Sequence, residues 1–428
     1  MGAETGGVKL LVVGGGWAGL AAAVRATQAG HQVTLLEMAS QTGGRARAVD
    51  IDGLQLDNGQ HILIGAYRRT LDLMRTVGVD VDAAFDRRPL ELRYPDGRGL
   101  RMPPGPAWLG FGVAVWRCNG WTARDRLALC RVAASWVLAG FRCEPGTTVA
   151  ALCSALPPAV RALLIDSLCV AALNTPAPEA DAGVFLRVLR DALFGGSGSA
   201  DLVLPRRSLG ALLPAPAQAW LVAAGATVLT GVRVEVIEAM AGRWRVGSVD
   251  YDRVVLACTA SEAARLVHGT APQWAAQARA LVYEPIVTVY LRCPGARLPA
   301  PMTALFESAV APAQYAFDHG ALGASPGIFA FVVSGARAWV DAGLEHTGQQ
   351  VLQQALRDFP AGTWPQTPTV LRVLAEKRAT FRCTPGLQRP PAAIAPGLVA
   401  AGDYVAGPYP ATLEGAVRAG EAAVRSLS

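Results

Sequence analysis

Three glycines near the N-terminus have the spacing of a turn that binds a pyrophosphate group. They lie in a glycine-rich run, residues 14–19, directly after the apolar segment 10–13. Gly14 would make the tight bend, Gly16 would let the backbone approach the phosphates, and Gly19 would let a helix pack closely on the strand. Free N–H groups at the start of that helix would hold the anion. The turn predicts five cofactor-binding residues: Gly14, Gly16, Trp17, Ala18 and Gly19.

The segments around this turn predict the elements that position it. We expect a strand at 10–13, an alanine-rich helix at 20–28 and a second strand at 32–37. Glu37 closes the second strand, where a carboxylate can hydrogen-bond a ribose 2′-hydroxyl and so disfavours a 2′-phosphate. This pattern predicts an α/β fold with a Rossmann-like dinucleotide-binding domain.

Further motifs separate a flavin from a nicotinamide cofactor. Gly43-Gly44-Arg45 follows the second strand, residues 57–61 read Asp-Asn-Gly-Gln-His, and a strand at 398–401 leads into Gly402-Asp403-Tyr404. A last helix opens within residues 410–416. These motifs, in this order, resemble those of the flavin amine oxidase and carotenoid desaturase superfamily. The resemblance implies FAD, bound in a discontinuous domain of the glutathione reductase type, beside a second α+β substrate domain.

The resemblance also implies roles for individual residues. Asp403 would hold the ribityl or phosphate end of FAD, and the N-terminus of the helix near Leu413 would point N–H groups at the flavin O2 edge. The backbone of Val234 would meet the adenine, although Val234 is equally consistent with an ordinary strand residue. The further implied cofactor-binding residues are Gly44, Arg45, Asn58, Gly59, Gly402 and Thr412.

Longer strings carry a narrower resemblance. Residues 57–67, 172–176, 376–381 and 402–404 look like those of the hydroxysqualene dehydroxylase family, and the likeness runs from about Lys9 to the C-terminus. Members of that family replace an allylic hydroxyl of hydroxysqualene by hydrogen to give squalene. The implied partners are a long isoprenoid substrate and an external electron donor that reduces the flavin. A carotenoid or phytoene desaturase, a flavin amine oxidase and a non-enzymatic prenyl-lipid carrier remain as alternatives.

Removal of an allylic hydroxyl needs a proton donor, since hydroxide is a poor leaving group. His61 follows the predicted flavin-facing motif and is one candidate acid; a structural histidine bonded to backbone is the alternative. Lys377 is one of only two lysines and is the second candidate, as an acid or to orient water near the flavin. A salt bridge with Glu376 or a solvated strand edge would explain Lys377 equally well.

We expect five segments along the chain. Residues 6–85, 203–268 and 390–428 would form the FAD-binding domain, 86–202 a mainly helical substrate and membrane-facing domain, and 269–389 the second part of the substrate domain. Within these we predict strands at 225–229, 232–237, 253–257, 286–291, 328–333 and 369–375. Helices are predicted at 160–173 and 347–359.

The composition excludes several other classes. With 52% hydrophobic and 17% charged residues over 428 positions, the chain is too apolar to be disordered. The eight cysteines form no C-x-x-C pair and the five histidines no metal-binding pattern, so we expect no metal site and thiols that act as small buried hydrophobes. No basic run with interleaved aromatics indicates nucleic acid.

Residues 105–142 contain four of the ten tryptophans, and five arginines against the single acid Asp125. Such a composition suits a surface that lies in the headgroup layer of a membrane, and it equally suits a buried helix of the substrate domain. Thr122 and Asp125 form a capping box that opens a helix ending near Gly140. No apolar run is long enough to span a bilayer and no secretion signal is visible, so we expect a cytoplasmic protein bound peripherally to the inner face of the membrane.

Overall fold

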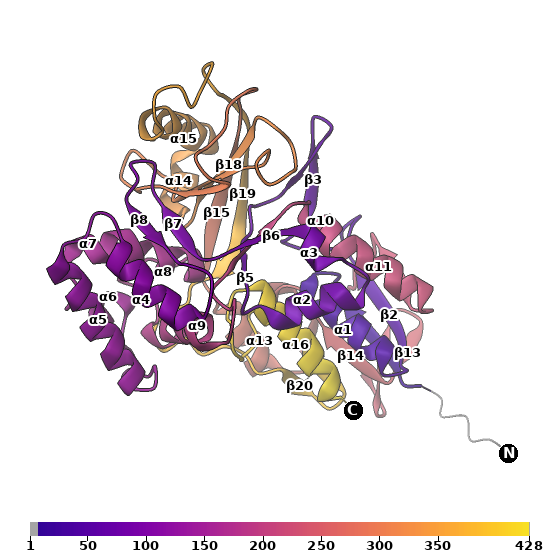
Figure 1. Ribbon diagram of the computed structural model, residues 1–428. Coiled ribbons are helices and arrows are strands. Elements are labelled where there is room, and N and C mark those ends of the chain that lie inside the picture. Colours follow the sequence, from indigo (N-terminus) through magenta and orange to yellow (C-terminus); the bar gives the residue numbers. More distant parts are fainter. Residues whose placement is uncertain (1–6, 428) are drawn as a thin grey trace.

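A six-stranded sheet forms the right-hand part of the molecule in Figure 1, a computed structural model that describes residues 7–427. Five of its strands are parallel and only the edge strand β20 is antiparallel. The strand order is β10 (Thr227–Thr230), β2 (Gln32–Glu37), β1 (Lys9–Val13), β14 (Arg253–Leu256), β21 (Leu398–Ala400) and β20 (Ala393–Ala395). Residue 6, the predicted start of the FAD-binding domain, lies outside the described residues, as do most of those inspected for a secretion signal.

The centre of this sheet is buried, as a sheet covered on both faces requires. Leu11 and Val12 of β1 are fully buried, and Val12 is in register with Leu35 of β2 and Val255 of β14. Three stretches that are distant in sequence therefore meet in one core. The predicted strand at 32–37 is confirmed with the same bounds, and the predicted α/β class is confirmed.

Two helices on this sheet pack with little space between them. Helix α1 (Trp17–Gln28) starts three residues before its predicted first residue, Leu20, and helix α16 (Leu413–Arg425) crosses it. A Cβ atom on Gly420 would lie 2.1 Å from the carbonyl oxygen of Ala18, so only glycine permits this approach. The other helices of this part are α2 (Arg68–Thr76), α3 (Val81–Ala84), α10 (Leu209–Leu212), α11 (Pro214–Ala223), α12 (Ala260–Val267) and α13 (Pro272–Arg279).

The predicted strand at 232–237 is wrong: this segment has no regular structure. The guanidinium of Arg265 donates to the carbonyl oxygens of Val234 and Glu235, both at 2.7 Å. A side chain on α12 thus occupies acceptors that a neighbouring strand would need. The chain next forms a three-stranded meander of β11 (Glu238–Met240), β12 (Arg243–Val246) and β13 (Val249–Tyr251).

A five-stranded antiparallel sheet stands above the parallel one in Figure 1, with α14 (Arg337–Ala342) and α15 (Leu344–Asp358) beside it. The predicted strand at 328–333 and helix near 347–359 are both present. The strand order is β16 (Met302–Ala304), β17 (Tyr315–Asp318), β18 (Ile328–Val333), β15 (Tyr283–Arg292) and β19 (Thr369–Phe381). Strand β19 extends six residues beyond its predicted end and reaches down toward the parallel sheet.

Helices fill the left of Figure 1 and form what we call the helical lobe, residues 107–194. The predicted helix at 160–173 is present as α7 (Pro158–Val160), a π-helical turn η1 (Arg161–Ile165) and α8 (Asp166–Leu173). Asn174 ends it in the left-handed region, with φ 47°. The other helices are α4 (Ala107–Arg117), α5 (Ala123–Leu138), α6 (Val149–Leu152) and α9 (Ala182–Phe194).

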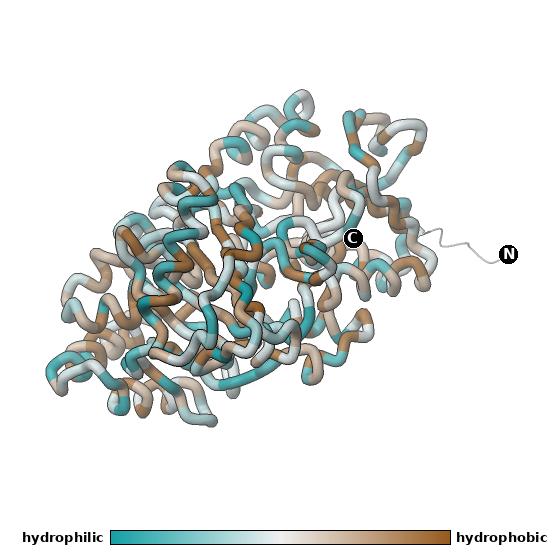
Figure 2. Tube along the Cα trace, turned by 90° about the horizontal axis from the view of Figure 1, so that it is seen from above, coloured by the Kyte–Doolittle hydropathy of each residue, from teal (hydrophilic) through white to brown (hydrophobic). Residues whose placement is uncertain are grey.

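The capping box of α5 is confirmed. The Thr122 hydroxyl accepts from the Asp125 N–H at 3.2 Å, and the Asp125 carboxylate accepts from the Thr122 N–H at 2.9 Å. Within residues 7–427 no helix is long and apolar enough to cross a membrane. Seen from above in Figure 2, hydrophobic segments run through both halves of the molecule.

Short strands connect the halves. Strand β9 (Leu202–Pro205) lies between β5 (Leu63–Ile64) and β6 (Phe85–Arg88), so the chain returning from the helical lobe pairs with the segments that lead into it. Two hairpins complete the fold: β3 (Ala48–Ile51) with β4 (Leu54–Asp57), and β7 (Glu91–Arg93) with β8 (Gly99–Arg101).

Candidate active site

A cavity of about 550 Å³ lies where the parallel sheet, strand β19 and helix α8 meet. Residues from every predicted motif line it, although Gly14 and Ala416 are 402 positions apart in the sequence. The predicted residues on its wall are Gly14, Gly16, Trp17, Ala18, Glu37, Gly44, Arg45, Asn58, Gly59, His61, Val234, Gly402, Asp403, Thr412 and Leu413. Of the predicted site residues, Gly19 and Lys377 do not line the cavity.

The geometry of the three glycines of the first turn fits the three separate roles predicted for them. Gly14 has φ 107°, and a Cβ on Gly19 would lie 1.8 Å from the Gly14 carbonyl oxygen. At both positions the fold itself therefore requires glycine. Gly16 differs, because an added Cβ would meet only the Cα of Gly44, at 3.9 Å, and the space beside it belongs to the cavity. Gly16 therefore leaves room for a ligand.

The second glycine pair supports the first. Gly43 donates its N–H to the carbonyl oxygen of Gly15 at 2.8 Å. Gly44 has φ 61°, and a Cβ there would come within 3.2 Å of the Gly16 Cα. The two turns together form a surface of backbone atoms without side chains at the N-terminus of α1, where the N–H groups favour a phosphate.

Glu37 is buried at the end of β2, on the wall of the cavity. One carboxylate oxygen accepts from the Gly15 N–H at 2.6 Å and the other from the Ala39 N–H at 2.7 Å. Each oxygen keeps a second lone pair, so the carboxylate is fixed in place and can still accept from a ribose hydroxyl. Its position suits the role that the sequence predicted.

An ion pair joins the second and last motifs. The Arg45 guanidinium lies 2.5 Å from Asp403, whose side chain is almost fully buried, and also donates to the carbonyl oxygen of Ala379 at 2.7 Å. Burial opposes the charge of Arg45, but the carboxylate of Asp403 raises its pKa above the ordinary value. Arg45 thereby holds β19 of one sheet against the closing motif of the other.

The closing motif holds two strained residues just before α16. Tyr409 and Ala411 are not glycines, yet their φ angles are 59° and 56°. Such conformations cost about 1–3 kcal/mol and persist where the surroundings impose them, commonly at ligand sites. Thr412 then caps α16, as its hydroxyl accepts from the Gly415 N–H at 3.0 Å. The helix N-terminus that this cap fixes lies at the cavity wall.

Glu414 is a part of this arrangement that sequence analysis missed. Its fully buried carboxylate accepts from the N–H and hydroxyl of Thr70, at 2.9 and 2.8 Å, and from Arg418 at 2.7 Å. It therefore caps α2, more than 340 residues earlier in the chain. An acidic residue in the first turn of a helix is too common to signal such a contact.

Tyr404 lies in the closing motif and, with Tyr409, was only a weaker candidate for the chemistry on sequence grounds. Its ring lines the cavity and is buried, and its hydroxyl has no hydrogen-bond partner within residues 7–427. A buried hydroxyl without a partner costs free energy. A polar atom of a bound group would satisfy it, which fits a cofactor that carries hydroxyls and phosphates.

His61 is half-buried on the cavity wall, and its Nδ1 lies 2.7 Å from the Gly59 carbonyl oxygen. A carbonyl only accepts, so Nδ1 carries the proton and Nε2 is an acceptor in the neutral ring. Burial lowers the pKa of His61 below its usual value, and the charge of Arg45 lowers it further, although the bond to Gly59 acts in the opposite direction. The backbone bond that was the alternative interpretation is thus present, and the ring still faces the cavity.

Lys377 is exposed on β19, while its neighbours Glu376 and Arg378 line the cavity. Successive side chains of a strand point to opposite faces, which puts Lys377 on the other side. The structure therefore contradicts the placement expected for Lys377 as an acid in this cavity. Glu376, which lies beside it in sequence, is the titratable group that β19 contributes instead.

The far wall of the cavity is mostly apolar. Helix α8 contributes residues 170–172, and the antiparallel sheet contributes Ile286, Phe317 and Val332, with Tyr315 and Ser334 as polar residues among them. Asn174 holds the end of α8, donating to the hydroxyl of Thr380 at 2.9 Å. One end of the cavity thus suits phosphates and sugars, and the other suits hydrocarbon.

The comparisons with known proteins agree with this geometry. Residues 17–428 match the family described as flavin containing amine oxidoreductase. The chain is 29% identical to a hydroxysqualene dehydroxylase of Rhodopseudomonas palustris and 27% identical to one of Sinorhizobium fredii, each over 96% of both chains. A zeta-carotene desaturase of Synechocystis is 40% identical over 72 residues, only 17% of this chain.

Among solved structures, an oxidoreductase from Methanosarcina mazei is similar with a TM-score of 0.72 and 19% identity, over 98% of this chain and all of that one. This likeness shows the fold. Together with the full-length relatives it confirms the predicted FAD cofactor and oxidoreductase class, and the glycine turns, Glu37 and the unpartnered Tyr404 hydroxyl fit that cofactor. The chain is thus an FAD-dependent oxidoreductase and belongs to the family of flavin-containing amine oxidoreductases.

Proposed function

We propose that this flavoprotein reductively removes the allylic hydroxyl of hydroxysqualene to give squalene. The observation that carries the proposal is the division of one cavity into a cofactor end and an apolar end bounded by α8 and the antiparallel sheet. Relatives with this activity in their name align along the whole chain, whereas the carotenoid desaturase aligns along a short part.

The reaction balances as an alcohol plus a proton and a hydride giving a hydrocarbon and water. When bound, FAD supplies the hydride transfer. The apolar wall would exclude water and hold the isoprenoid arms, so that the allylic cation left by departing water is not captured by solvent. Each turnover consumes two electrons, which an external electron donor must supply.

His61 is the residue that we assign to the leaving hydroxyl. In its neutral form Nε2 would accept the hydroxyl hydrogen and orient the alcohol, and in its protonated form it would donate the proton that makes water leave. Burial lowers the pKa of His61 below its usual 6.5, so the ring is mostly neutral at pH 6.5. Its protonated fraction falls further as the pH rises. We therefore expect the single-turnover rate to fall as pH is raised from 6 to 8.

His61→Gln should slow dehydroxylation by about 100- to 10,000-fold, the usual contribution of a positioned acid. Flavin absorbance should be unchanged, and the pH dependence should flatten. Lys377→Met is the matched control, because that side chain is exposed and outside the cavity. An unchanged rate and pH profile in His61→Gln would remove His61 from the mechanism without touching the proposed substrate.

The substrate is tested by incubating chemically reduced enzyme with hydroxysqualene without oxygen and measuring squalene. We expect squalene in proportion to reduced flavin. Squalene formed by oxidised enzyme alone, or consumption of phytoene only, would overturn the proposal in favour of a desaturase.

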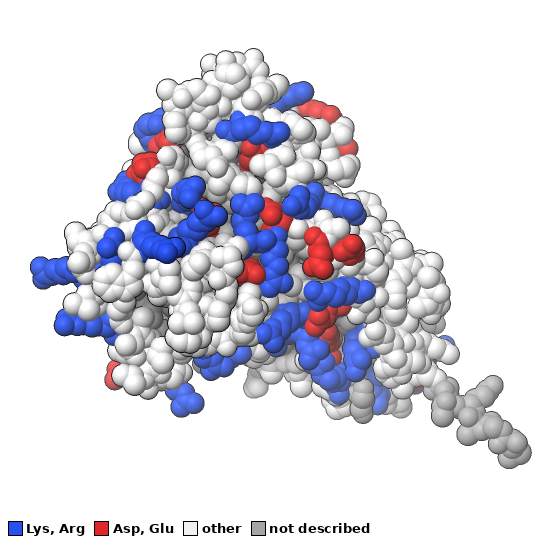
Figure 3. Space-filling view, in the orientation of Figure 1, with Lys and Arg blue, Asp and Glu red and all other residues white. Residues whose placement is uncertain are grey.

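We propose further that the helical lobe binds peripherally to the cytoplasmic face of a membrane. Trp108 and Trp116 on α4 are 54% and 57% exposed, whereas Trp121 and Trp136 are buried. Two of the four tryptophans in residues 105–142 are therefore core, and the other two lie on the surface, where membrane contact would require them. Basic side chains project from this edge of the molecule, at the left of Figure 3, which suits anionic headgroups.

Replacing Trp108 and Trp116 by serine should weaken binding to anionic liposomes about tenfold or more, with flavin content unchanged. Val222→Ser on α11 is the control, since Val222 is 57% exposed but lies in the other half of the molecule. Equal liposome binding by both variants would contradict a membrane-facing role for α4.

A further inference from the structure

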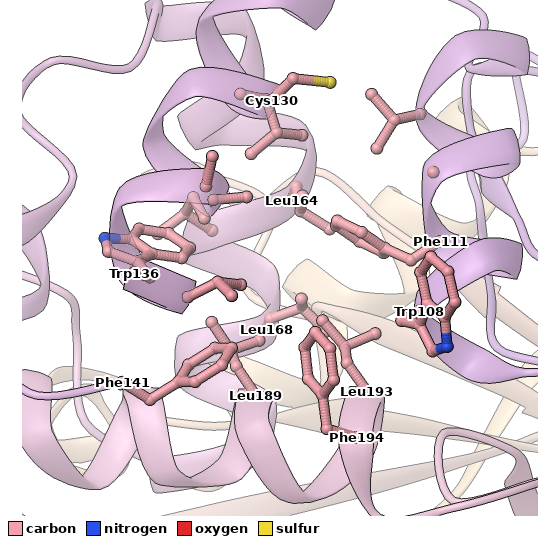
Figure 4. Close-up of a pocket in the computed structure, with 17 residues that line it drawn as sticks. Trp108, Phe111, Cys130, Trp136, Phe141, Leu164, Leu168, Leu189, Leu193 and Phe194 are labelled. Atoms are coloured by element: carbon pink, nitrogen blue, oxygen red, sulfur yellow. The ribbon is translucent and has the colours of Figure 1, made fainter. Parts of the chain in front are cut away.

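A second cavity, separate from the flavin cavity, lies inside the helical lobe. It has a volume of about 230 Å³ and is enclosed by α4, α5, η1 with α8, and α9, as Figure 4 shows. Seventeen residues line it. The large ones are Trp108, Phe111, Leu129, Trp136, Phe141, Leu164, Leu168, Leu189, Leu193 and Phe194.

The lining offers water almost no hydrogen bonds. It contains no charged side chain, and the only side-chain heteroatoms are the Cys130 sulfur and the indole nitrogens of Trp108 and Trp136. In Figure 4 both indole nitrogens lie on the outer sides of their rings. An engineered apolar cavity of about 150 Å³ stays dry and takes up benzene. A larger space with the same chemistry suits a hydrocarbon.

Small residues on facing helices keep this space open. Gly112 on α4 faces Ala133 and Ala134 on α5 across the cavity lining, and a Cβ on Gly112 would meet nothing within 4 Å. Gly112 has none of the φ strain that requires glycine elsewhere in the chain. Larger side chains at these three positions would fill the cavity.

The cavity opens to the surface between apolar side chains. Trp108, Val137 and Phe194 line it and are 54%, 47% and 48% exposed. Around this lobe Arg117, Arg124, Arg131 and Arg142 are exposed, and none forms an ion pair within residues 7–427. An apolar mouth on a lobe that carries exposed, unpaired arginines fits a lipid chain that arrives from beneath anionic headgroups.

One continuous helix separates the two cavities. Leu164, Ile165 and Leu168 face the second cavity, and residues 170–172 face the flavin cavity. The π-helical turn η1 lies at the first of these faces, and such turns are frequent at functional sites. A hydrocarbon in the second cavity would therefore lie one helix away from the apolar end of the flavin cavity.

We propose that this second cavity is a binding site for the aliphatic chain of an isoprenoid lipid, held outside the flavin cavity. The isoprenoid identity rests on the proposed function, whereas the affinity for an aliphatic chain rests on the lining alone. The site would hold a chain between the membrane and the reaction.

The probe for this site is a dibrominated C18 fatty acid, whose bromine atoms quench tryptophan fluorescence at short range. Titrated into FAD-loaded enzyme without membranes, it should quench saturably, because Trp108 and Trp136 line the cavity. The cavity-filling variant Gly112→Leu/Ala133→Phe should weaken this binding at least tenfold with flavin absorbance unchanged. Val113→Leu on the same helix is the matched control, as Val113 is exposed and outside the lining.

Equal binding by the filled variant and the control would overturn the proposal, as would the absence of saturable quenching in the parent enzyme. If the filled variant does not fold, a fatty acid with a photoreactive diazirine on its chain replaces it. Labelled peptides should then come from α4, α5, η1–α8 or α9, and labels confined to other segments would count against the site.

Turnover separates this proposal from the proposed function. Saturable quenching without dehydroxylation of hydroxysqualene would retain the site and reject the reaction. Dehydroxylation without quenching would retain the reaction and reject the site.

Discussion

The flavin cavity and the cavity of the helical lobe are built in opposite ways. Backbone turns, a half-buried ion pair and two helix N-termini form the cofactor end of the flavin cavity, so we expect single positions such as Gly16 and Arg45 to decide what fits there. The cavity of the helical lobe is formed by interchangeable apolar side chains from four helices. The cofactor site therefore depends on a few residues that cannot be replaced, whereas the hydrocarbon site depends on the total volume left by its side chains.

The largest expected effect comes from Gly16→Val. The fold has room for a side chain there, but the phosphates of FAD would occupy the same space. We expect a folded protein with unchanged far-UV circular dichroism and complete loss of flavin absorbance. It should still bind the brominated fatty acid. Gly269→Val is the control, since a Cβ at Gly269 meets nothing within 4 Å and φ there is not positive.

If Gly16→Val retained flavin, this single position would not determine cofactor binding.

The next effect is on the pH dependence of stability. Titratable groups are buried near the flavin cavity, whereas the lining of the helical-lobe cavity has no charged side chain. Burial raises the pKa of Asp57 from 3.8 to about 7, although the Leu209 N–H acts in the opposite direction. The folded state thus binds this proton more tightly than the unfolded state, and stability falls as pH rises from about 4 through 7. The upper limit of that loss is about 4 kcal/mol.

Asp57→Asn should keep the bond from Leu209 and remove this loss. The variant should exceed the parent in free energy of unfolding at pH 8 by about 1–4 kcal/mol, and this difference should shrink toward zero as pH falls below about 4, as measured by urea titration. Asp72→Asn, at an exposed carboxylate, should change neither value. Parallel pH curves for parent and Asp57→Asn would contradict the expected shift.

Arg45→Met leaves the Asp403 carboxylate buried without its partner and releases β19 from the closing motif. We expect FAD affinity to fall by about 10- to 100-fold, which corresponds to about 1.4–2.8 kcal/mol. Flavin fluorescence on dilution measures it. Partial recovery in Arg45→Lys would show that charge is what matters, and an unchanged affinity would mean that the ion pair does not shape the site.

The smallest expected effect is that of Tyr404→Phe, which removes only the unpartnered hydroxyl. If a polar atom of FAD bonds to it, affinity should fall about 3- to 10-fold, as for one hydrogen bond. Thermal stability of the flavin-free protein should stay the same or rise, since the orphaned group is gone. Unchanged FAD affinity would show that the hydroxyl meets no part of the cofactor.

The same contrast explains what could be predicted from the sequence. Gly14 and Gly19 are required by backbone geometry and Gly16 by the space that a ligand needs, so their spacing alone indicated the turn and its ligand. Strand 232–237 could not be predicted correctly, because Arg265, about 30 residues later, takes its carbonyl groups.

Side-chain direction was the second obstacle. The choice of Lys377 failed because alternation along β19 turns that residue outward, and its register was not known. The second cavity left no signal at all, since Gly112, Ala133 and the leucines around it look like any packed helices. Which tryptophans of residues 105–142 are exposed and which are buried depends on how each helix faces its neighbours, and composition does not reveal that orientation.

The contact between Glu414 and Thr70 has a consequence for biosynthesis. Helix α2 is made early, but the carboxylate that caps it, and the strands β20 and β21 that complete the parallel sheet, belong to the last 40 residues. On the ribosome the first half of the FAD-binding domain must therefore wait, with exposed sheet edges, until residues 393–414 have been made. Cofactor capture is then expected only after synthesis of this segment, and a truncation before it would leave sheet edges that favour aggregation.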